Sequence, residues 1–532
     1  MTRPRLRRGA AAAVSVSFAL LFARAAAPAL AVDRSLGAGV PKPAATGAPW
    51  TDAEIASLAA NADVALAGSA AVRGAHVGVY AIDARDGRVL YQRNADDDFQ
   101  PASTFKLLVG SAALERLGPA FRFHTEVLAG GPVANGALQG ALVLRGGGDP
   151  FLNAADLDAA ASAVAKAGIA RTGSLLIDDT RYETPGYLPG WNWDDFPYYY
   201  APVVSALTLE ENVVHLTVAP GGAAGDAATV TAAPVGTVLT HAAGCREPTA
   251  AVTVVASEVQ TGASGAKDTI DLQRDRSGCI RMTGTIPAGA KPDTVEAAVP
   301  SPAVYAHDAF VAALKRHGVE VSEPSAVPAA WPFEHRLAEV PPSALPSPTT
   351  TLWMHDSEPL SDVLADLWLP SDNLVAELLL RELGTNAPYG TPGTTAHGIA
   401  LEKSWLQSLG VDPSALAIDD GSGLSAYDRI SPRALVAILK HDWDSPNRDL
   451  VLDDLPLAGV RGTLKSSYTG TAAEKHVFAK TGSISHVSTL AGYAANVKHG
   501  AVIFAFQVDD WVGEAAALRE LRGRILSRFV ED

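Results

Sequence analysis

After residue 50, the chain alternates between two hydrophobic periods. Apolar positions three and four residues apart predict an amphipathic helix over 51–66, and strict alternation predicts a strand over 76–82. Asp86-Gly87 is a typical hairpin turn, so 88–92 is expected to pair with this strand. The hairpin leads into a further helix that ends near Gly118, because glycine is a common helix terminator.

The C-terminal part of the chain shows helical periodicity first and strand periodicity later. A long amphipathic helix closes the pattern. Helices are expected at 361–369, 374–383 and 514–530, and strands at 490–495 and 501–507.

A long stretch lies between these two parts. About 265 positions separate Lys106 from Ser371, whereas whole extra domains typically span about 50 to 250 residues. The stretch contains short strand-like runs, such as 140–144 and 213–218. The spacing therefore predicts an insertion within the domain that holds both chain ends.

The first chemical signal is Ser103-Thr104-Phe105-Lys106, at the start of a predicted helix. Residues three apart on a helix are neighbours, so the Ser103 hydroxyl and the Lys106 amine can touch. A neutral lysine can take the proton of a nucleophilic serine, and burial or a second cation favours the neutral amine. The pattern alone is weak, because Ser264-Gly265-Ala266-Lys267 repeats it in a Gly-rich segment.

Two further motifs strengthen this signal. Ser371-Asp372-Asn373 lies in a loop before an apolar helix, and Lys480-Thr481-Gly482-Ser483 follows a strand-like run. S-x-N recurs as Ser445-Pro446-Asn447 in a polar turn, whereas K-T-G occurs once. The three motifs, in this order and each on the expected element, resemble the motif set of serine penicillin-binding proteins and β-lactamases.

The N-terminal residues predict export. Residues 1–31 combine a basic start, a short apolar run and small residues at the end, which is typical of a secretory signal peptide. A membrane anchor is the alternative, but Arg24 interrupts the run, which is shorter than the roughly 20 residues of a spanning helix. We therefore expect a periplasmic, extracellular or wall-associated protein without a transmembrane segment.

Charge, histidines and cysteines narrow the function further. A net charge of -16 argues against nucleic acid or anionic lipid as a partner. The histidines show no metal-ligand spacing, so no metal site and no cofactor is expected. Cys245 and Cys279 of an exported protein can form one disulfide or remain two buried thiols, and the sequence leaves both open.

The chain is similar to the D-alanyl-D-alanine carboxypeptidase/endopeptidase family of class C low-molecular-mass penicillin-binding proteins. The resemblance covers nearly the whole mature chain. Besides the three motifs and the insertion, it rests on 144–150, 201–207, 420–425 and 459–464. Taken alone, Asp420-Gly421-Ser422-Gly423 would be an ordinary turn.

This resemblance implies an α+β fold: a transpeptidase-like catalytic domain, made of an antiparallel sheet flanked by helices and a helical lobe, with two nested inserted domains. Strands from both chain ends are expected to share the sheet. The expected limits are 1–31 for the signal peptide, 45–129 with 326–532 for the catalytic domain, 130–146 with 217–325 for inserted domain II, and 147–216 for inserted domain III.

The resemblance also assigns roles for acyl transfer. Ser103 is expected to attack the carbonyl of the D-Ala-D-Ala bond of peptidoglycan stem peptides, and Lys106 to take its proton. The positive charge of Lys480 would help to lower the pKa of Lys106. Backbone N–H groups of Ser103 and Ser483 would hold the oxyanion. β-Lactam antibiotics would acylate the same serine and inhibit the enzyme.

The remaining motif residues are expected to bind the substrate and release the product. Ser371 would relay a proton to the leaving D-alanine, and Asn373 would contact the substrate backbone. Lys480, together with Thr481-Gly482-Ser483, would bind the terminal carboxylate.

An aromatic loop at 189–200 predicts a side-chain pocket. In the family subgroup that accepts meso-diaminopimelate peptides, a Trp, an Asp and a Tyr on this loop form such a pocket, and Trp191, Asp194 and Tyr199 are similar in type and spacing. Aromatic walls would pack on the methylene chain while a carboxylate pairs with the amino end. Asp195 is a rival for the acidic role, and a cluster that merely anchors the loop is the alternative.

Two other functions fit the three motifs. A class A β-lactamase would need a glutamate in an E-x-x-L-N context, and neither Glu377 nor Glu402 has that context. A wall-binding or penicillin-sensing module without catalysis would predict loss of Ser103, Lys106 or Lys480, and all three are present. A D,D-peptidase is therefore the favoured prediction.

Overall fold

A computed structural model describes residues 40–183, 188–233, 237–240, 252–274, 279–322, 349–385 and 392–532. The predicted signal peptide at 1–31 lies outside these residues, as does Cys245. Cys279 is buried and disulfide-bonded. Among the helices that the structure describes, none is long and apolar enough to cross a membrane.

Strands from both ends of the chain form one five-stranded sheet. Its order is β18-β19-β20-β1-β2, and every neighbouring pair is antiparallel. This arrangement confirms the predicted α+β class and the sheet shared by both chain ends. The strands are β1 (His76–Asp83), β2 (Val89–Arg93), β18 (Val477–Ile484), β19 (Val487–Asn496) and β20 (Gly500–Asp509).

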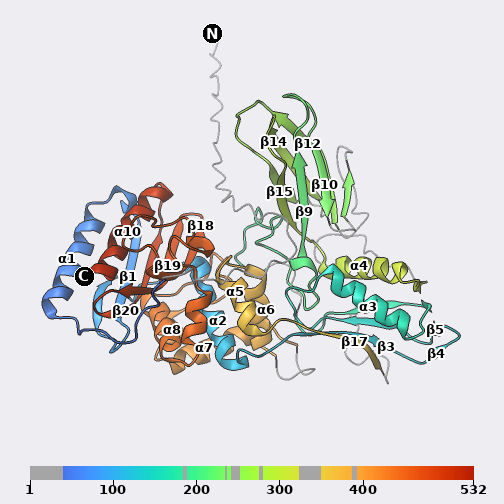
Figure 1. Cartoon of the computed structure of the whole chain (residues 1–532), viewed down its shortest axis with the longest axis horizontal. Helices are drawn as coiled ribbons and strands as arrows, with labels where there is room; N and C mark the ends of the chain where they lie inside the picture. The colour runs from blue at the N-terminus through green and yellow to red at the C-terminus, as the bar shows by residue number, and fades with distance from the viewer. Residues whose placement is uncertain are drawn as a thin grey trace, which may run out of the picture.

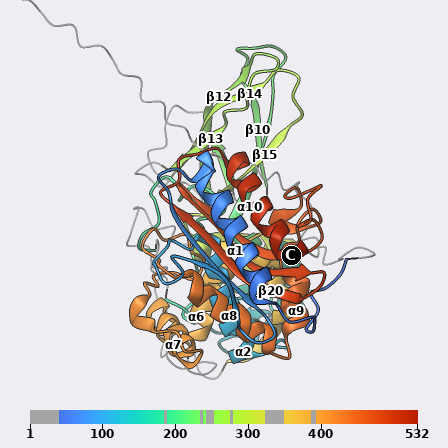
Figure 2. The same ribbon diagram turned by 90° about the vertical axis from the view of Figure 1, so that its left-hand side faces the viewer.

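Helices cover both faces of this sheet, so its strands β1 and β20 are buried on both sides. Because strand side chains alternate between faces, Val79 packs with α1 (Asp52–Ala67) and α10 (Ala515–Glu531), which lie side by side in Figure 2. Tyr80 packs on the opposite face with residues of α8 (Pro432–Asp444).

A helical lobe continues the second of these cores. Helix α2 (Lys106–Leu117) is buried over its first nine residues, and a Cβ atom on Gly110 would lie 2.6 Å from the Trp368 ring. Only a glycine therefore allows α2 to approach Trp368 this closely. The other helices of the lobe are α5 (Leu360–Trp368), α6 (Asn373–Leu383), α7 (Thr395–Ser408) and α9 (Arg448–Asp454).

A second sheet has the order β17-β3-β6-β8 and forms one side of the body that carries α3 (Ala154–Lys166) and α4 (Pro302–Arg316) (Figure 1). In the predicted division of the chain, β3 and β17 belong to the catalytic domain, β6 to inserted domain II and β8 to inserted domain III. The predicted domain limits stay a prediction. The strands are β3 (His124–Ala129), β6 (Leu142–Arg145), β8 (Leu175–Asp178) and β17 (Thr350–Asp356).

Three further sheets lie in the described part of the region between the S-x-x-K and S-x-N motifs. One is β16-β7-β5-β4, with β4 (Val133–Ala134), β5 (Ala137–Leu138), β7 (Arg171–Thr172) and β16 (Glu320–Val321). Another is β10-β9-β15, with β9 (Val213–Ala219), β10 (Thr229–Ala233) and β15 (Asp293–Ala298). The third is β11-β12-β14-β13, with β11 (Thr237–Thr240), β12 (Val252–Gly262), β13 (Asp271–Arg274) and β14 (Ile280–Pro287).

Candidate active site

Ser103 lies on a short 3-10 helix, Ala102–Phe105, that continues into α2. The α-helix itself begins at Lys106, so the predicted helical start is a 3-10 turn, in which positions i and i+3 lie above one another. The Nζ atom of Lys106 lies 3.0 Å from the Oγ atom of Ser103. Ala102 has a left-handed backbone with φ of +44°, which is uncommon for a residue with a side chain and is often found at functional sites.

Two glycines, one in the 420–425 segment and one in the K-T-G motif, pack closely against the backbone of this turn. A Cβ atom on Gly423 would lie 1.9 Å from the carbonyl oxygen of Ala102. A Cβ atom on Gly482 would lie 2.9 Å from the backbone nitrogen of Ser103. Both neighbours are backbone atoms that cannot rotate away, so larger residues at either position would displace the serine.

Lys106 is fully buried and makes three polar contacts. Besides Ser103 Oγ, its amine donates to Asn373 Oδ1 at 2.5 Å and to the carbonyl oxygen of Ser422 at 2.7 Å. The last two groups can only accept hydrogen bonds, and a neutral amine has two N–H groups and one lone pair. When Lys106 is neutral, its lone pair therefore faces the hydroxyl of Ser103.

Burial lowers the pKa of Lys106 to about 8, against the opposing effect of three nearby carboxylates. Burial and the charge of Lys106 also place the pKa of Lys480 well below its usual value. Burial is the main cause for both amines, and the predicted lowering of the Lys106 pKa by the charge of Lys480 is not seen; the charge of Lys106 instead lowers the pKa of Lys480.

The S-x-N motif lies beside both lysines. Lys480 Nζ donates to Ser371 Oγ at 2.8 Å, and Ser371 has a left-handed backbone with φ of +74°. Asp372 caps α6 by accepting from the backbone N–H of Val375 at 3.0 Å. Asn373 then starts the helix, and its Nδ2 atom donates to the carbonyl oxygen of Tyr200 at 2.6 Å. The motif thus joins the nucleophile to the aromatic loop.

The K-T-G motif lies on β18, the edge strand of the sheet. Ala479 N donates to the carbonyl oxygen of Pro456, away from β19. Because backbone direction alternates along a strand, the N–H groups of Thr481 and Ser483 face the same open edge. Ser483 is exposed, and the Thr481 hydroxyl lies 2.7 Å from that of Thr463.

Two buried carboxylates organise the turn that accepts from Lys106. Glu377 lies one helical turn after Asn373, and its Oε1 atom accepts from the backbone N–H groups of Gly421 and Ser422 at 2.9 and 3.0 Å. Burial is the main cause that raises the pKa of Glu377 to about 7. Asp420 is also fully buried and accepts from Gly423 N at 2.6 Å. Neither role was predicted from the sequence.

The aromatic loop contains both buried and exposed predicted pocket residues. Trp191 is 8% exposed and donates through Nε1 to Asp420 Oδ2 at 2.8 Å. Asp194 and Tyr199 are exposed at the surface of the loop. Asp195 is half-buried and accepts hydrogen bonds from Tyr200 and Asn192, so its carboxylate stabilises the loop itself.

The site geometry agrees with a match to known proteins. A model of the D-Ala-D-Ala carboxypeptidase 3 (S13) family matches residues 58–525. The chain belongs to this family. The match confirms the predicted resemblance to serine D,D-peptidases and identifies the protein as an enzyme of this class.

Individual relatives of this S13 carboxypeptidase extend over most of the chain. A D-alanyl-D-alanine carboxypeptidase of Actinomadura sp. (strain R39) is 35% identical over 440 residues, 80% of this chain and 76% of the relative. The D-alanyl-D-alanine carboxypeptidase DacB of Haemophilus influenzae is 25% identical over 436 residues, 81% of this chain and 85% of the relative. The structure of penicillin binding protein 4 (dacB) from Haemophilus influenzae matches with a TM-score of 0.72 and 23% identity, covering 90% of this chain and 99% of that one. This likeness confirms the predicted fold.

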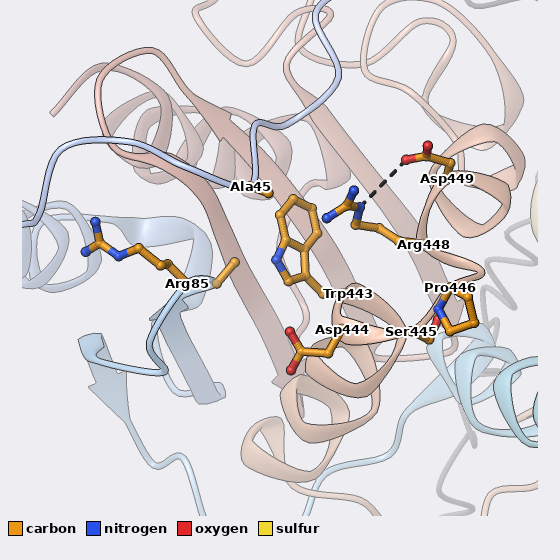
Figure 3. A pocket seen from close by; sticks show the side chains of 9 residues that line it. Ala45, Arg85, Trp443, Asp444, Ser445, Pro446, Arg448 and Asp449 are labelled. Atoms are coloured by element: carbon orange, nitrogen blue, oxygen red, sulfur yellow. Dashed lines mark ion pairs between the residues drawn. The ribbon is translucent and has the colours of Figure 1, made fainter.

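Figure 3 shows a cavity of about 380 Å³ in this carboxypeptidase, and none of the residues that line it belongs to the three motifs. Within it the Arg448 guanidinium lies 5.1 Å from the centre of the Trp443 ring and pairs with Asp449 at 3.7 Å. Ser445 and Pro446, from the second S-x-N pattern, line the cavity. This pattern therefore lies outside the cluster that holds Ser103.

Proposed function

We propose that the protein is an exported serine D,D-carboxypeptidase and endopeptidase that cleaves peptidoglycan stem peptides through an acyl-enzyme on Ser103. The observation that carries this proposal is the setting of Lys106. Its amine touches Ser103 Oγ at 3.0 Å, and its two other partners accept hydrogen bonds only. This arrangement orients a neutral amine to take the serine proton.

Acylation begins when Lys106 accepts the proton of Ser103 and the Oγ atom attacks the carbonyl carbon of the D-Ala-D-Ala bond. The carbonyl oxygen becomes an oxyanion, which the backbone N–H groups of Ser103 and Ser483 stabilise. The open edge of β18 supports this role, because the N–H group of Ser483 faces away from β19.

Collapse of this intermediate breaks the C–N bond and needs a proton on the leaving amine. The proton held by Lys106 can pass through the Ser371 hydroxyl, which Lys480 holds at 2.8 Å. Lys480 with the hydroxyls of Thr481 and Ser483 binds the terminal carboxylate of the substrate, and Gly482 keeps this strand close to the nucleophile.

Asn373 has two functions in this scheme. Its Oδ1 atom holds Lys106, while its Nδ2 atom is bonded to the Tyr200 carbonyl oxygen. The predicted contact with the substrate backbone then requires Nδ2 to exchange the Tyr200 carbonyl for a substrate carbonyl.

Water hydrolyses the acyl-enzyme to complete the cycle. The bond cleaved is the terminal D-Ala-D-Ala bond in the carboxypeptidase reaction and a D-Ala-diaminopimelate cross-link in the endopeptidase reaction. β-Lactams acylate Ser103 in the same way, but water hydrolyses the resulting acyl-enzyme slowly, which makes these drugs inhibitors.

The side-chain pocket is proposed to lie on the aromatic loop. Asp194 and Tyr199 are exposed there, so they are available to the amino end and the methylene chain of diaminopimelate. Trp191 would form the base of the loop beneath them, because its ring is buried and bonded to Asp420.

Release of D-alanine from synthetic diaminopimelyl and lysyl peptides ending in D-Ala-D-Ala tests this function. Wild type should release D-alanine and Ser103→Ala should not. Asp194→Ala should lose the preference for the diaminopimelyl peptide while retaining activity on the lysyl one. Equal release by wild type and Ser103→Ala would refute the proposal, and an undiminished preference in Asp194→Ala would refute the pocket.

A further inference from the structure

Asp420 receives four hydrogen bonds although it is fully buried. One oxygen accepts from Gly423 N at 2.6 Å. The other accepts from Ser425 N at 2.7 Å, Trp191 Nε1 at 2.8 Å and Ser422 Oγ at 3.2 Å. A buried carboxylate with this many donors is held in one position.

One peptide group connects this carboxylate to Lys106. The Ser422 carbonyl accepts from Lys106 Nζ at 2.7 Å, and the N–H of the same peptide group belongs to Gly423 and donates to Asp420. A carboxylate on the N–H side polarises the carbonyl and makes it a stronger acceptor, because hydrogen bonds in a chain reinforce each other in a buried setting.

The chain of hydrogen bonds extends to the aromatic loop through Trp191. Its indole is the side-chain donor to Asp420 that comes from the inserted region, 229 positions away in sequence. A second contact from the loop, Tyr200 O with Asn373 Nδ2, reaches the other acceptor of Lys106. The loop therefore contacts Asn373 directly and reaches the Ser422 carbonyl through Asp420.

We propose that Asp420 is a positioning residue for Lys106, and that Trp191 couples the position of the 189–200 loop to Lys106, the proton acceptor. This inference rests on the proposed acylation of Ser103. Trp191 then acts on the chemical step for every substrate, including those that have no diaminopimelyl side chain.

The charged groups that face Lys106 make the pH dependence of the acylation rate a second test of this proposal. Asp420, Asp372 and Glu377 favour its charged form, and Lys480 lies on the other side of Ser371. Removing the charge of Asp420 disfavours the ammonium form while the other two carboxylates stay. The rise of the acylation rate with pH should then begin at lower pH, because Lys106 loses its proton more easily.

The decisive experiment measures acylation by benzylpenicillin, which lacks a diaminopimelyl side chain, by intact mass over time. Trp191→Phe keeps an aromatic ring and removes the donor to Asp420. Trp193→Phe is the matched control, because Trp193 is on the same loop, 52% exposed, and packs on the Phe196 ring. We expect about a tenfold slower acylation in Trp191→Phe, as for loss of one hydrogen bond to a charged group, and an unchanged rate in Trp193→Phe.

A wild-type acylation rate in Trp191→Phe, combined with slower cleavage of diaminopimelyl peptides, would overturn the inference and leave Trp191 as a pocket wall. Absence of any adduct in wild type would instead refute the proposed function. For Asp420→Asn, rates are expressed per molecule able to form the adduct. For this variant we expect a lower maximal acylation rate, and a rise of the rate with pH that begins at lower pH than in wild type. A rise at the same pH as in wild type would show that Asp420 has a structural role only. If Asp420→Asn does not fold, the Trp191→Phe result decides.

Discussion

The Nζ atom of Lys106 lies 3.0 Å from the Oγ atom of Ser103, and burial lowers the pKa of this amine to about 8. Only the neutral amine can accept the serine proton, and its fraction rises with pH until the pKa is passed. Acylation by benzylpenicillin should therefore speed up about tenfold per pH unit from pH 6 to 7 and level off above about 8. Stopped-flow rates between pH 6 and 9.5 test this, and a flat profile would contradict it.

Asn373→Asp replaces a neutral acceptor of Lys106 by a carboxylate of the same shape. The new charge lies at hydrogen-bond distance from Nζ and should raise the pKa of Lys106, so less neutral amine is present at neutral pH. We expect acylation at pH 7 to fall by more than about tenfold and to recover partly above pH 9. Loss of rate without recovery at high pH would show that the contact with Tyr200 matters more than the charge.

Gly482→Ala tests the packing of β18 on the nucleophile turn. The added Cβ atom would meet Pro101 O at 2.7 Å and Ser103 N at 2.9 Å, so the turn must move. We expect acylation to fall by about a hundredfold or more, since small displacements at a reacting centre have large effects. Gly173→Ala is the control, because nothing lies within 4 Å of its Cβ position, and it should acylate like wild type. Equal rates in the two variants would exclude this packing constraint.

The sequence predicted the parts of the site that lie within single motifs. The spacing of Ser103 and Lys106 is local, and a 3-10 turn preserves the contact that an α-helix would give. The hydrophobic periods also predicted strands of the five-stranded sheet and helices that pack on it. These features depend on neighbouring residues, which a pattern can record.

The groups that orient Lys106 depend on distant residues. The segment around Asp420 contributes to the family resemblance but taken alone predicts an ordinary turn, and the sequence offers Glu377 only as a candidate for a deacylating glutamate. Their roles follow from burial between α6 and the 420–425 turn, which no local pattern describes. The sequence predicts Trp191 as a pocket wall, and this role stays a prediction; its buried indole donates to Asp420, a distant partner that no local pattern indicates. The roles of the exposed Asp194 and Tyr199 in this pocket also stay predictions.

Asp442→Asn tests a buried carboxyl outside the active site. Burial raises the pKa of Asp442 to about 7, above the ordinary 3.8, although Ser111 donates to it. Between these values the folded protein holds a proton that the unfolded chain lacks, so wild-type stability falls as pH rises, by at most about 4 kcal/mol for this group.

The asparagine variant lacks this ionisation. Its melting temperature should match wild type near pH 4 and exceed it increasingly towards pH 8. Asp444→Asn is the control, since Asp444 is 60% exposed and pairs with Lys440, and its difference from wild type should stay small at every pH. A constant difference between Asp442→Asn and wild type from pH 4 to 8 would contradict the buried ionisation.

Intact mass after brief exposure to benzylpenicillin tests the central claim most directly, on wild type and on Ser103→Ala. The account predicts one adduct per wild-type chain, mapped to Ser103 and stable over minutes, and no adduct in the variant. An adduct that turns over within seconds would indicate a β-lactamase. An adduct that persists in Ser103→Ala, or none in wild type, would contradict the assignment of Ser103 as the nucleophile.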